Sequence, residues 1–228
     1  MKTTKAARRE RRAQRKDKRG RSRTTSPFGA ADLDTLLAAF DPMAPWPDIA
    51  PRILPVLKRA WHPYPADAEP VHVNVPPGIP TGFGIDLGPA FSHVTPRQLD
   101  VWGIDRAMLL GTALENLRSL VRREPPAIQR FRQDGVDIQA VQGQGWGSAL
   151  VLLPDVLQAM LGAEPLILLV PVRNTLIAVP DAVDPEFAFG LWQALASGAH
   201  DALDVDPLRW TGTTVVALQD VSTRGLPN

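Results

Sequence analysis

The sequence predicts an α+β fold, in which a mostly antiparallel sheet packs with several short helices and is preceded by a disordered basic tail. Three observations carry this prediction. Helical patterns, strand patterns and further helical patterns follow one another, with hairpin signals between the strands. Hydrophobic residues make up 44% of the 228 residues, which suffices for a sizeable core. The 23 prolines argue against a long-helix bundle, because proline breaks helix interiors. We expect a tail and linker over residues 1–29 and a single domain over residues 30–228.

The amino-terminal tail carries much of the positive charge. Residues 1–23 hold 12 of the 25 lysines and arginines but 2 of the 24 acidic residues, a net charge of +10, which leaves −9 for the other residues. Apart from Met1 the tail has no apolar residue larger than alanine, so it cannot offset its ordering entropy by burial and should be disordered when free. The cations that we expect to contact a polyanion are Arg8, Arg9, Arg11, Arg12, Arg15, Lys16, Lys18 and Arg19.

The composition of the tail narrows its possible partners. Its helical wheel has no apolar face, which argues against a membrane anchor and favours a nucleic acid or an acidic protein surface. The tail has no Trp, Tyr or Phe for base stacking, so it should contact phosphates without sequence preference. Two other interpretations stay open: the tail is only a solubilising extension, or it folds back on the acidic remainder of the chain.

The first elements of the domain are two helices and two strands. Apolar residues at helical spacing predict a helix over residues 31–40 and another over about 47–61, although two prolines fall inside the second. Alternating valines predict a strand over 71–75. A second strand over 83–88 should pair with it through a Pro/Gly-rich turn.

Two helices and a hairpin follow. Thr95, Pro96 and Gln98 form a capping-box pattern that starts a short helix, which ends at Gly103. A single apolar stripe predicts a longer helix over 105–123.

The next elements depend on glycine for their ends. Asp134-Gly135 between alternating residues predicts a two-residue hairpin. The apolar segment at 149–154 is expected to be a short strand or another buried segment, and 154–161 a short helix closed by Gly162.

The last elements should build the centre and end of the sheet. The continuously apolar segments 165–172 and 175–180 predict adjacent strands near the middle of the core. An Asp-Pro cap starts a helix over 184–198, which is apolar nearly all round and should be well buried. A final strand is expected at about 213–218.

Three segments carry a family resemblance. They are ALENL at 113–117, SALVLLPDVLQAML at 148–161 and VPVRNTLIAVPD at 170–181. Through them, residues 71–184 resemble the bacterial YtpQ-like proteins, a family of unknown function. The resemblance implies a compact cytoplasmic α+β body and assigns no catalytic residue, and it leaves the basic tail outside the matched region.

Several kinds of chemistry find no pattern here. The chain has no cysteine, which excludes disulfides, thiolate metal sites and cysteine nucleophiles. No metal site is expected, because the four histidines lack ligand spacing; their best combination would be His72 and His93 with Asp86. The glycines at 82–88 and 143–147 lack nucleotide-binding spacing and are interpreted as flexible hairpin residues. Acid/base catalysis by carboxylates stays open, because the acidic residues are too numerous to indicate a site.

Three residues are candidates for contact with a ligand or a partner. Arg173 and Asn174 lie between two apolar strands, where their side chains can reach a ligand, although asparagine also suits a tight turn. Trp146 lies between glycines, where it is either an exposed contact residue or a cover for the sheet.

These observations predict a non-enzymatic interaction protein whose basic arm contacts a nucleic acid or another polyanion. We expect no cofactor and no membrane span, and a cytoplasmic location, because no apolar stretch of a secretory signal follows the basic residues. The alternative is a small-molecule-binding protein or an enzyme whose site is assembled from distant residues. A third interpretation is a body that binds a protein partner while the arm is passive.

Overall fold

The structure is a computed structural model, which describes residues 35, 40–57, 69–88, 90–199 and 201–218. The chain divides into two units, residues 1–40 and 41–228. In the first unit the described residues are Thr35, which is helical, and Phe40. The expected tail and nearly all of the expected first helix therefore lie outside the described residues.

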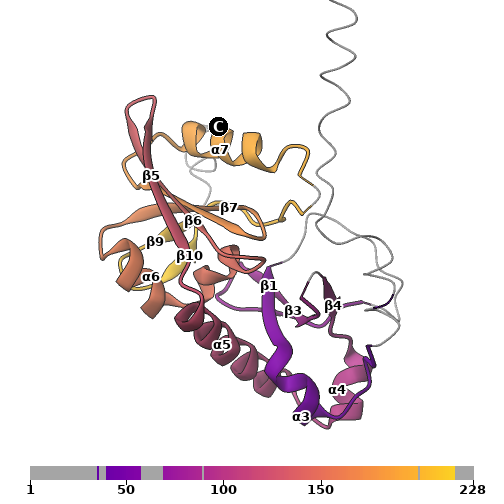
Figure 1. Cartoon of the computed structure of the whole chain (residues 1–228). Helices are drawn as coiled ribbons and strands as arrows, with labels where there is room; N and C mark the ends of the chain where they lie inside the picture. Colours follow the sequence, from indigo (N-terminus) through magenta and orange to yellow (C-terminus); the bar gives the residue numbers. More distant parts are fainter. Residues whose placement is uncertain (1–34, 36–39, 58–68, 89, 200, 219–228) are drawn as a thin grey trace, which may run out of the picture. The chain divides into compact units, whose positions relative to one another are not determined.

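Residues 41–228 form an α+β fold with two antiparallel sheets, which confirms the predicted class (Figure 1). The strands of the first sheet are β1 (Ile53–Leu57), β2 (His72–Asn74), β3 (Pro80–Asp86) and β4 (Phe91–His93). Strand β1 pairs along one side of β3, while β2 and β4 pair with successive halves of its other side. The expected pairing of β2 with β3 is thus confirmed, whereas β4 was not predicted.

The second sheet has the strand order β10-β9-β7-β8-β6-β5. Its strands are β5 (Ala127–Gln133), β6 (Val136–Gln142), β7 (Leu166–Val172), β8 (Thr175–Pro180), β9 (Leu208–Trp210) and β10 (Val215–Ala217). The apolar strands β7 and β8 lie in the middle of the sheet and are almost fully buried, as predicted.

Helices connect and cover the sheets. They are α3 (Trp46–Ile49), α4 (Pro96–Trp102), α5 (Arg106–Arg123), α6 (Pro154–Leu161) and α7 (Pro185–Ala196), with 3₁₀-helices η1 (Ala50–Arg52) and η3 (Gly147–Leu152). None of these described helices has the length and apolar character that a membrane crossing requires.

The residues that punctuate the chain act as predicted. At the start of α4 the backbone N–H of Thr95 donates to Gln98 Oε1 at 2.7 Å, and Gly103 ends the helix with a φ of 64°. In the β5–β6 hairpin, Asp134 and Gly135 have φ values of 51° and 82°, as a two-residue turn of this hand requires.

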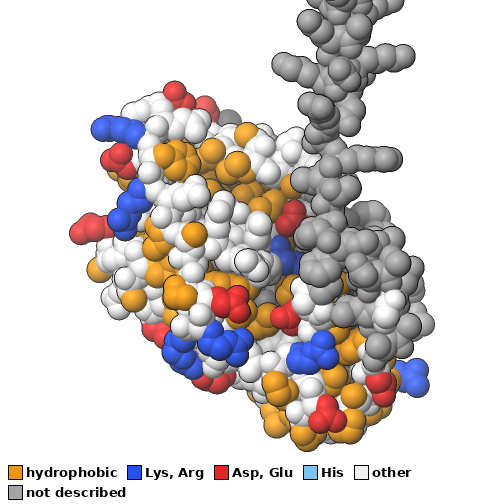
Figure 2. Space-filling model, viewed as in Figure 1, with side chains coloured by type: hydrophobic (Ala, Val, Ile, Leu, Met, Phe, Trp, Pro, Cys, Tyr) orange, Lys and Arg blue, Asp and Glu red, His pale blue; other side chains and the backbone are white. Residues whose placement is uncertain are grey.

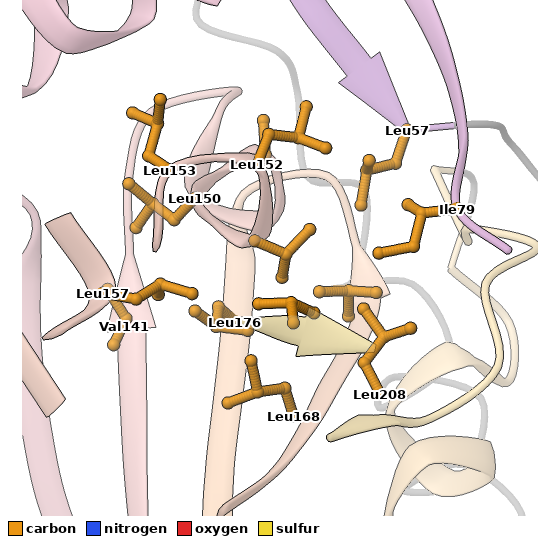
Figure 3. Close-up of a cluster of buried hydrophobic side chains, with 14 of the residues drawn as sticks. Leu57, Ile79, Val141, Leu150, Leu152, Leu153, Leu157, Leu168, Leu176 and Leu208 are labelled. Carbon is orange, nitrogen blue, oxygen red and sulfur yellow. The ribbon is translucent and has the colours of Figure 1, made fainter. Parts of the chain in front are cut away.

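One core joins both sheets and lies on one face of the second sheet. Leu57 and Ile79 come from the first sheet, and Figure 3 shows their side chains beside those of the second sheet and of η3. The buried residues Leu150, Leu168 and Leu176 belong to the same cluster. The two sheets therefore share apolar contacts that either sheet would lose on separation.

The opposite face of the second sheet is covered by α7. Phe187, Ala188, Leu191 and Trp192 of this helix pack against a second cluster of buried sheet residues. The prediction that α7 is well buried is nevertheless wrong: Ala188 alone is buried among its residues, and Phe189 is 45% exposed. The helix lies on a sheet from one side, so its all-round apolar composition exceeds what that one side can cover.

The predicted helix over 47–61 is also wrong. The described residues there form α3 and η1 and then the buried strand β1, which runs from Ile53 to Leu57. Pro55 lies inside this strand, where the absence of a backbone N–H is tolerated at the edge of a sheet but would break a helix. The apolar residues that fit a helical stripe are instead buried on both faces of a strand.

Two further segments refine the predictions. The apolar segment at 149–154 is buried, as expected, but most of it lies in the 3₁₀-helix η3 rather than in a strand. The carboxyl-terminal hairpin has two strands, β9 and β10, of which the predicted strand at 213–218 is the second.

Truncation of Leu168 to alanine tests the position of the core. This side chain is fully buried in β7, so Leu168→Ala should lower the free energy of unfolding by about 2–5 kcal/mol. The matched substitution Leu195→Ala removes a leucine that is 42% exposed on α7 and should change it by less than about 0.5 kcal/mol. Urea denaturation followed by circular dichroism measures both, and equal losses would contradict the assigned core.

Candidate functional site

A glycine-rich loop and a tight turn meet at one end of the second sheet. The loop, residues 143–147, follows β6, and the turn Arg173–Asn174 joins β7 to β8. Strands β6 and β8 are neighbours, so the loop and the turn emerge side by side. The backbone N–H of Gly143 donates to Asn174 O, and that of Ser148 donates to Arg173 O, both at 3.0 Å. These two hydrogen bonds fasten the turn to the loop.

Two glycines allow the loop to approach this closely. A Cβ atom on Gly147 would lie 2.3 Å from Asn174 O, and one on Gly143 would lie 2.8 Å from the ring of Trp146. Both distances are far below van der Waals contact. The interpretation of these glycines as flexible hairpin residues is therefore wrong at these two positions, where glycine makes room for close packing.

Trp146 is enclosed by this arrangement. Its side chain is 3% exposed and belongs to the main core cluster, so it covers the sheet rather than standing free in solvent. Its indole N–H has no hydrogen-bond acceptor among the described residues. A buried donor without an acceptor costs about 1–3 kcal/mol, so this tryptophan is held in place by its packing.

Arg173 is positioned by an aromatic ring from the first sheet. Its guanidinium lies 4.9 Å from the centroid of Phe91 in β4. The ring of Phe91 in turn packs over Gly84 of β3, where a Cβ atom would approach it to 2.7 Å. A cation over an aromatic face is stabilised by about 0.5–1 kcal/mol at an exposed site, so this contact restrains the arginine side chain.

A cavity of about 530 Å³ lies at this junction, and Arg173, Asn174 and Trp146 all line it. The structure thus brings together the three residues that the sequence singled out for ligand or partner contact. The cavity is also lined by the ends of β3 and α5, by Phe91 and by Asp201. Its volume falls within the range of about 300–1,000 Å³ that is usual for small-molecule sites.

Charges of both signs line the cavity. Arg123 and Arg173 supply two cations, and Asp86, Glu124 and Asp201 supply three carboxylates. Asp86 also supports the wall, because its Oδ1 atom accepts a hydrogen bond from the backbone N–H of Gly88 at 2.8 Å. The lining therefore offers both donors and acceptors to a polar molecule.

The histidine pair considered from the sequence forms no metal centre in the described part of the chain. His72 lies on β2 and His93 on β4, and Asp86 ends β3. Among the residues described, no group of three His, Asp or Glu side chains is placed to hold a metal ion, and this includes His72, His93 and Asp86. Asp86 belongs to the cavity instead.

Sequence reasoning missed most of the cavity wall. Phe91, Gln144 and Asp201 were not singled out, because no local pattern distinguishes them from surface residues. The cations at positions 8–19 lie outside the described residues, so the structure does not relate them to the cavity.

Comparisons of the chain with protein-family models, with curated proteins and with solved structures find no match. The resemblance to the YtpQ-like proteins therefore stays a prediction.

Substitution of Gly147 tests the contact between the loop and the turn. Gly147→Ala places a methyl group against the Asn174 carbonyl and should lower the free energy of unfolding by about 3 kcal/mol. The control Gly111→Ala adds the same methyl group to α5 in open space and should raise it by about 0.5–1 kcal/mol, because alanine favours helix. Chemical denaturation measures both, and a neutral effect of Gly147→Ala would show that the turn does not lie against the loop.

Proposed function

We propose that the protein is a non-enzymatic interaction protein whose basic arm, residues 1–23, contacts a nucleic acid or another polyanion. The observation that carries this proposal is the division of charge: +10 in the arm and −9 in the rest of the chain. Charge of this density attracts phosphates, whereas the remainder of the chain repels them on average. A cytoplasmic location is part of the proposal.

The arrangement of charge in the folded part supports this assignment. Basic and acidic side chains lie next to one another on the face shown in Figure 2. Four arginines form ion pairs with carboxylates: Arg118 with Asp155, Arg122 with Glu115, Arg132 with Asp137 and Arg209 with Asp181. Such exposed pairs add little stability, but each carboxylate offsets the positive charge that a phosphate would meet.

The expected mode of contact follows from the residue types in the arm. Eight of its cations lie between positions 8 and 19, and no aromatic residue accompanies them. Binding should therefore be electrostatic and indifferent to sequence, because phosphates carry no sequence information. An acidic protein surface satisfies the same charge requirement, so a nucleic acid is compared with an acidic polypeptide in the test.

A second candidate function is the binding of a small molecule by the folded part. The observation that favours it is the convergence of Arg173, Asn174 and Trp146 on one cavity.

Neutralisation of the arm tests the first proposal in the full chain. The variant Arg8→Gln, Arg9→Gln, Arg11→Gln, Arg12→Gln should bind RNA and duplex DNA more weakly. The slope of log affinity against log salt should become shallower by about 3–4, since each neutralised phosphate contributes about 0.7–0.9. Fluorescence anisotropy across a salt series measures affinity and slope, with polyglutamate as the acidic polypeptide.

The matched control removes four exposed cations from the folded part. It is Arg97→Gln, Arg106→Gln, Arg122→Gln, Arg132→Gln, which changes the net charge by the same amount. The proposal expects its slope to stay close to that of the unchanged protein. Equal losses in both variants would show that net charge, and not the arm, governs binding. Absence of binding to every polyanion would contradict the proposal outright.

A further inference from the structure

We propose that the cavity beside Arg173 binds a small zwitterion, namely a free α-amino acid with an apolar side chain. This inference rests on the second candidate function, the binding of a small molecule by the folded part, and names the class of ligand. It does not depend on the basic arm.

The carboxylate end of such a ligand fits the side of the cavity formed by the turn and the loop. Arg173 provides a guanidinium that Phe91 restrains, and a planar guanidinium matches a carboxylate in geometry as well as in charge. The hydroxyl of Thr175 donates to Asn174 Oδ1 at 3.1 Å, which leaves the amide NH₂ group of Asn174 as a donor. The ligand oxygens thus meet donors from two adjacent residues of the turn.

The loop adds backbone donors on the same side. The N–H groups of Gln144 and Gly145 donate to no acceptor in the described part of the chain, and both residues line the cavity. Gly145 has a φ of 76°, the left-handed conformation that turns successive N–H groups toward one side of a chain. Such groups suit an anionic oxygen.

The ammonium end fits the other side, at the end of α5. Glu124 caps this helix and lines the cavity, together with Asp86 and Asp201. The carboxyl-terminal end of an 18-residue helix carries partial negative charge, which favours a cation close to it. An ammonium group therefore meets both carboxylates and the helix end.

The charge balance of the lining selects a zwitterion over a simple ion. Three carboxylates face two arginines, a net charge of −1. A phosphate or a dicarboxylate would bring two negative charges to a site that is already negative, and a simple amine would leave the arginines without an anion. A ligand with one charge of each sign leaves neither set of groups opposed.

The remaining wall accounts for an apolar side chain. Leu54, Phe91, Leu120 and Trp146 line the cavity beside the charged groups. A volume of about 530 Å³ exceeds what the backbone of an amino acid needs, so room is left for a side chain the size of leucine or phenylalanine.

The test is isothermal titration calorimetry on the full chain with a matched series of probes. L-phenylalanine and L-leucine are compared with 2-phenylethylamine, which lacks the carboxylate, and with 3-phenylpropanoate, which lacks the ammonium. Inorganic phosphate and succinate complete the series. We expect an amino acid to bind and each analogue with one charge removed to bind at least about tenfold more weakly, since a charge-assisted hydrogen bond is lost.

Variants locate the binding. Arg173→Gln should weaken amino-acid binding at least about tenfold and abolish the preference over 2-phenylethylamine. Glu124→Gln should reduce the preference over 3-phenylpropanoate. The control Arg132→Gln changes an exposed arginine outside the cavity lining and should leave binding unchanged. Thermal denaturation without ligand shows that each variant is folded, and a weakening by Arg132→Gln equal to that by Arg173→Gln would overturn the assigned site.

The outcomes separate the ligand class from the existence of a site. Preferential binding of phosphate or succinate that depends on Arg173 would overturn the zwitterion and keep the second candidate function. No heat with any probe would overturn the proposed ligand class, and a wider thermal-shift screen without a hit would remove the second candidate function with it. The four-residue arm variant should bind the amino acid as the unchanged protein does, and a loss there would overturn the independence of the site from the arm.

Discussion

The close contact between Gly147 and the Asn174 carbonyl is the constraint on which the architecture of the site depends. It brings two chain segments together at a distance that no residue with a Cβ atom allows. On one side of the contact η3 enters the core with all six of its residues buried. On the other side the turn presents Arg173 to the cavity. A single backbone contact thus couples core packing to the orientation of the charged wall, because both segments are short and leave it in opposite directions.

Local signals allowed much of the fold to be predicted from the sequence. The capping pattern at Thr95 and the Asp134-Gly135 turn act within a few residues, and the structure confirms both. The failure at β1 has the opposite origin. Ile53–Leu57 fits a helical stripe when considered alone, and its strand conformation is stabilised by pairing with β3, some thirty residues further along the chain. For α7, composition indicated burial, but the number of faces covered depends on the whole assembly.

The same division between local and distant information applies to the candidate site. Arg173, Asn174 and Trp146 are unusual in their immediate surroundings, so each could be singled out from the sequence. Phe91 could not, because its role depends on the cation that a turn about eighty residues away places over its ring. The glycines of the loop were misinterpreted for a related reason. Glycine favours both flexible turns and close backbone contacts, and the partner that distinguishes the two belongs to another strand connection.

The two proposed binding functions use charge in opposite ways. In the arm, cations follow one another along the chain with few carboxylates, so attraction comes from the density of like charge and is strongly screened by salt. In the cavity, cations and carboxylates face one another across a concave wall that includes a buried tryptophan. Selectivity there comes from the separation of the two signs and is less sensitive to salt, because partly buried charges are less exposed to counterions. Ionic strength therefore separates the two functions within one chain: a salt concentration that removes a polyanion from the arm leaves a zwitterion in the cavity largely unaffected.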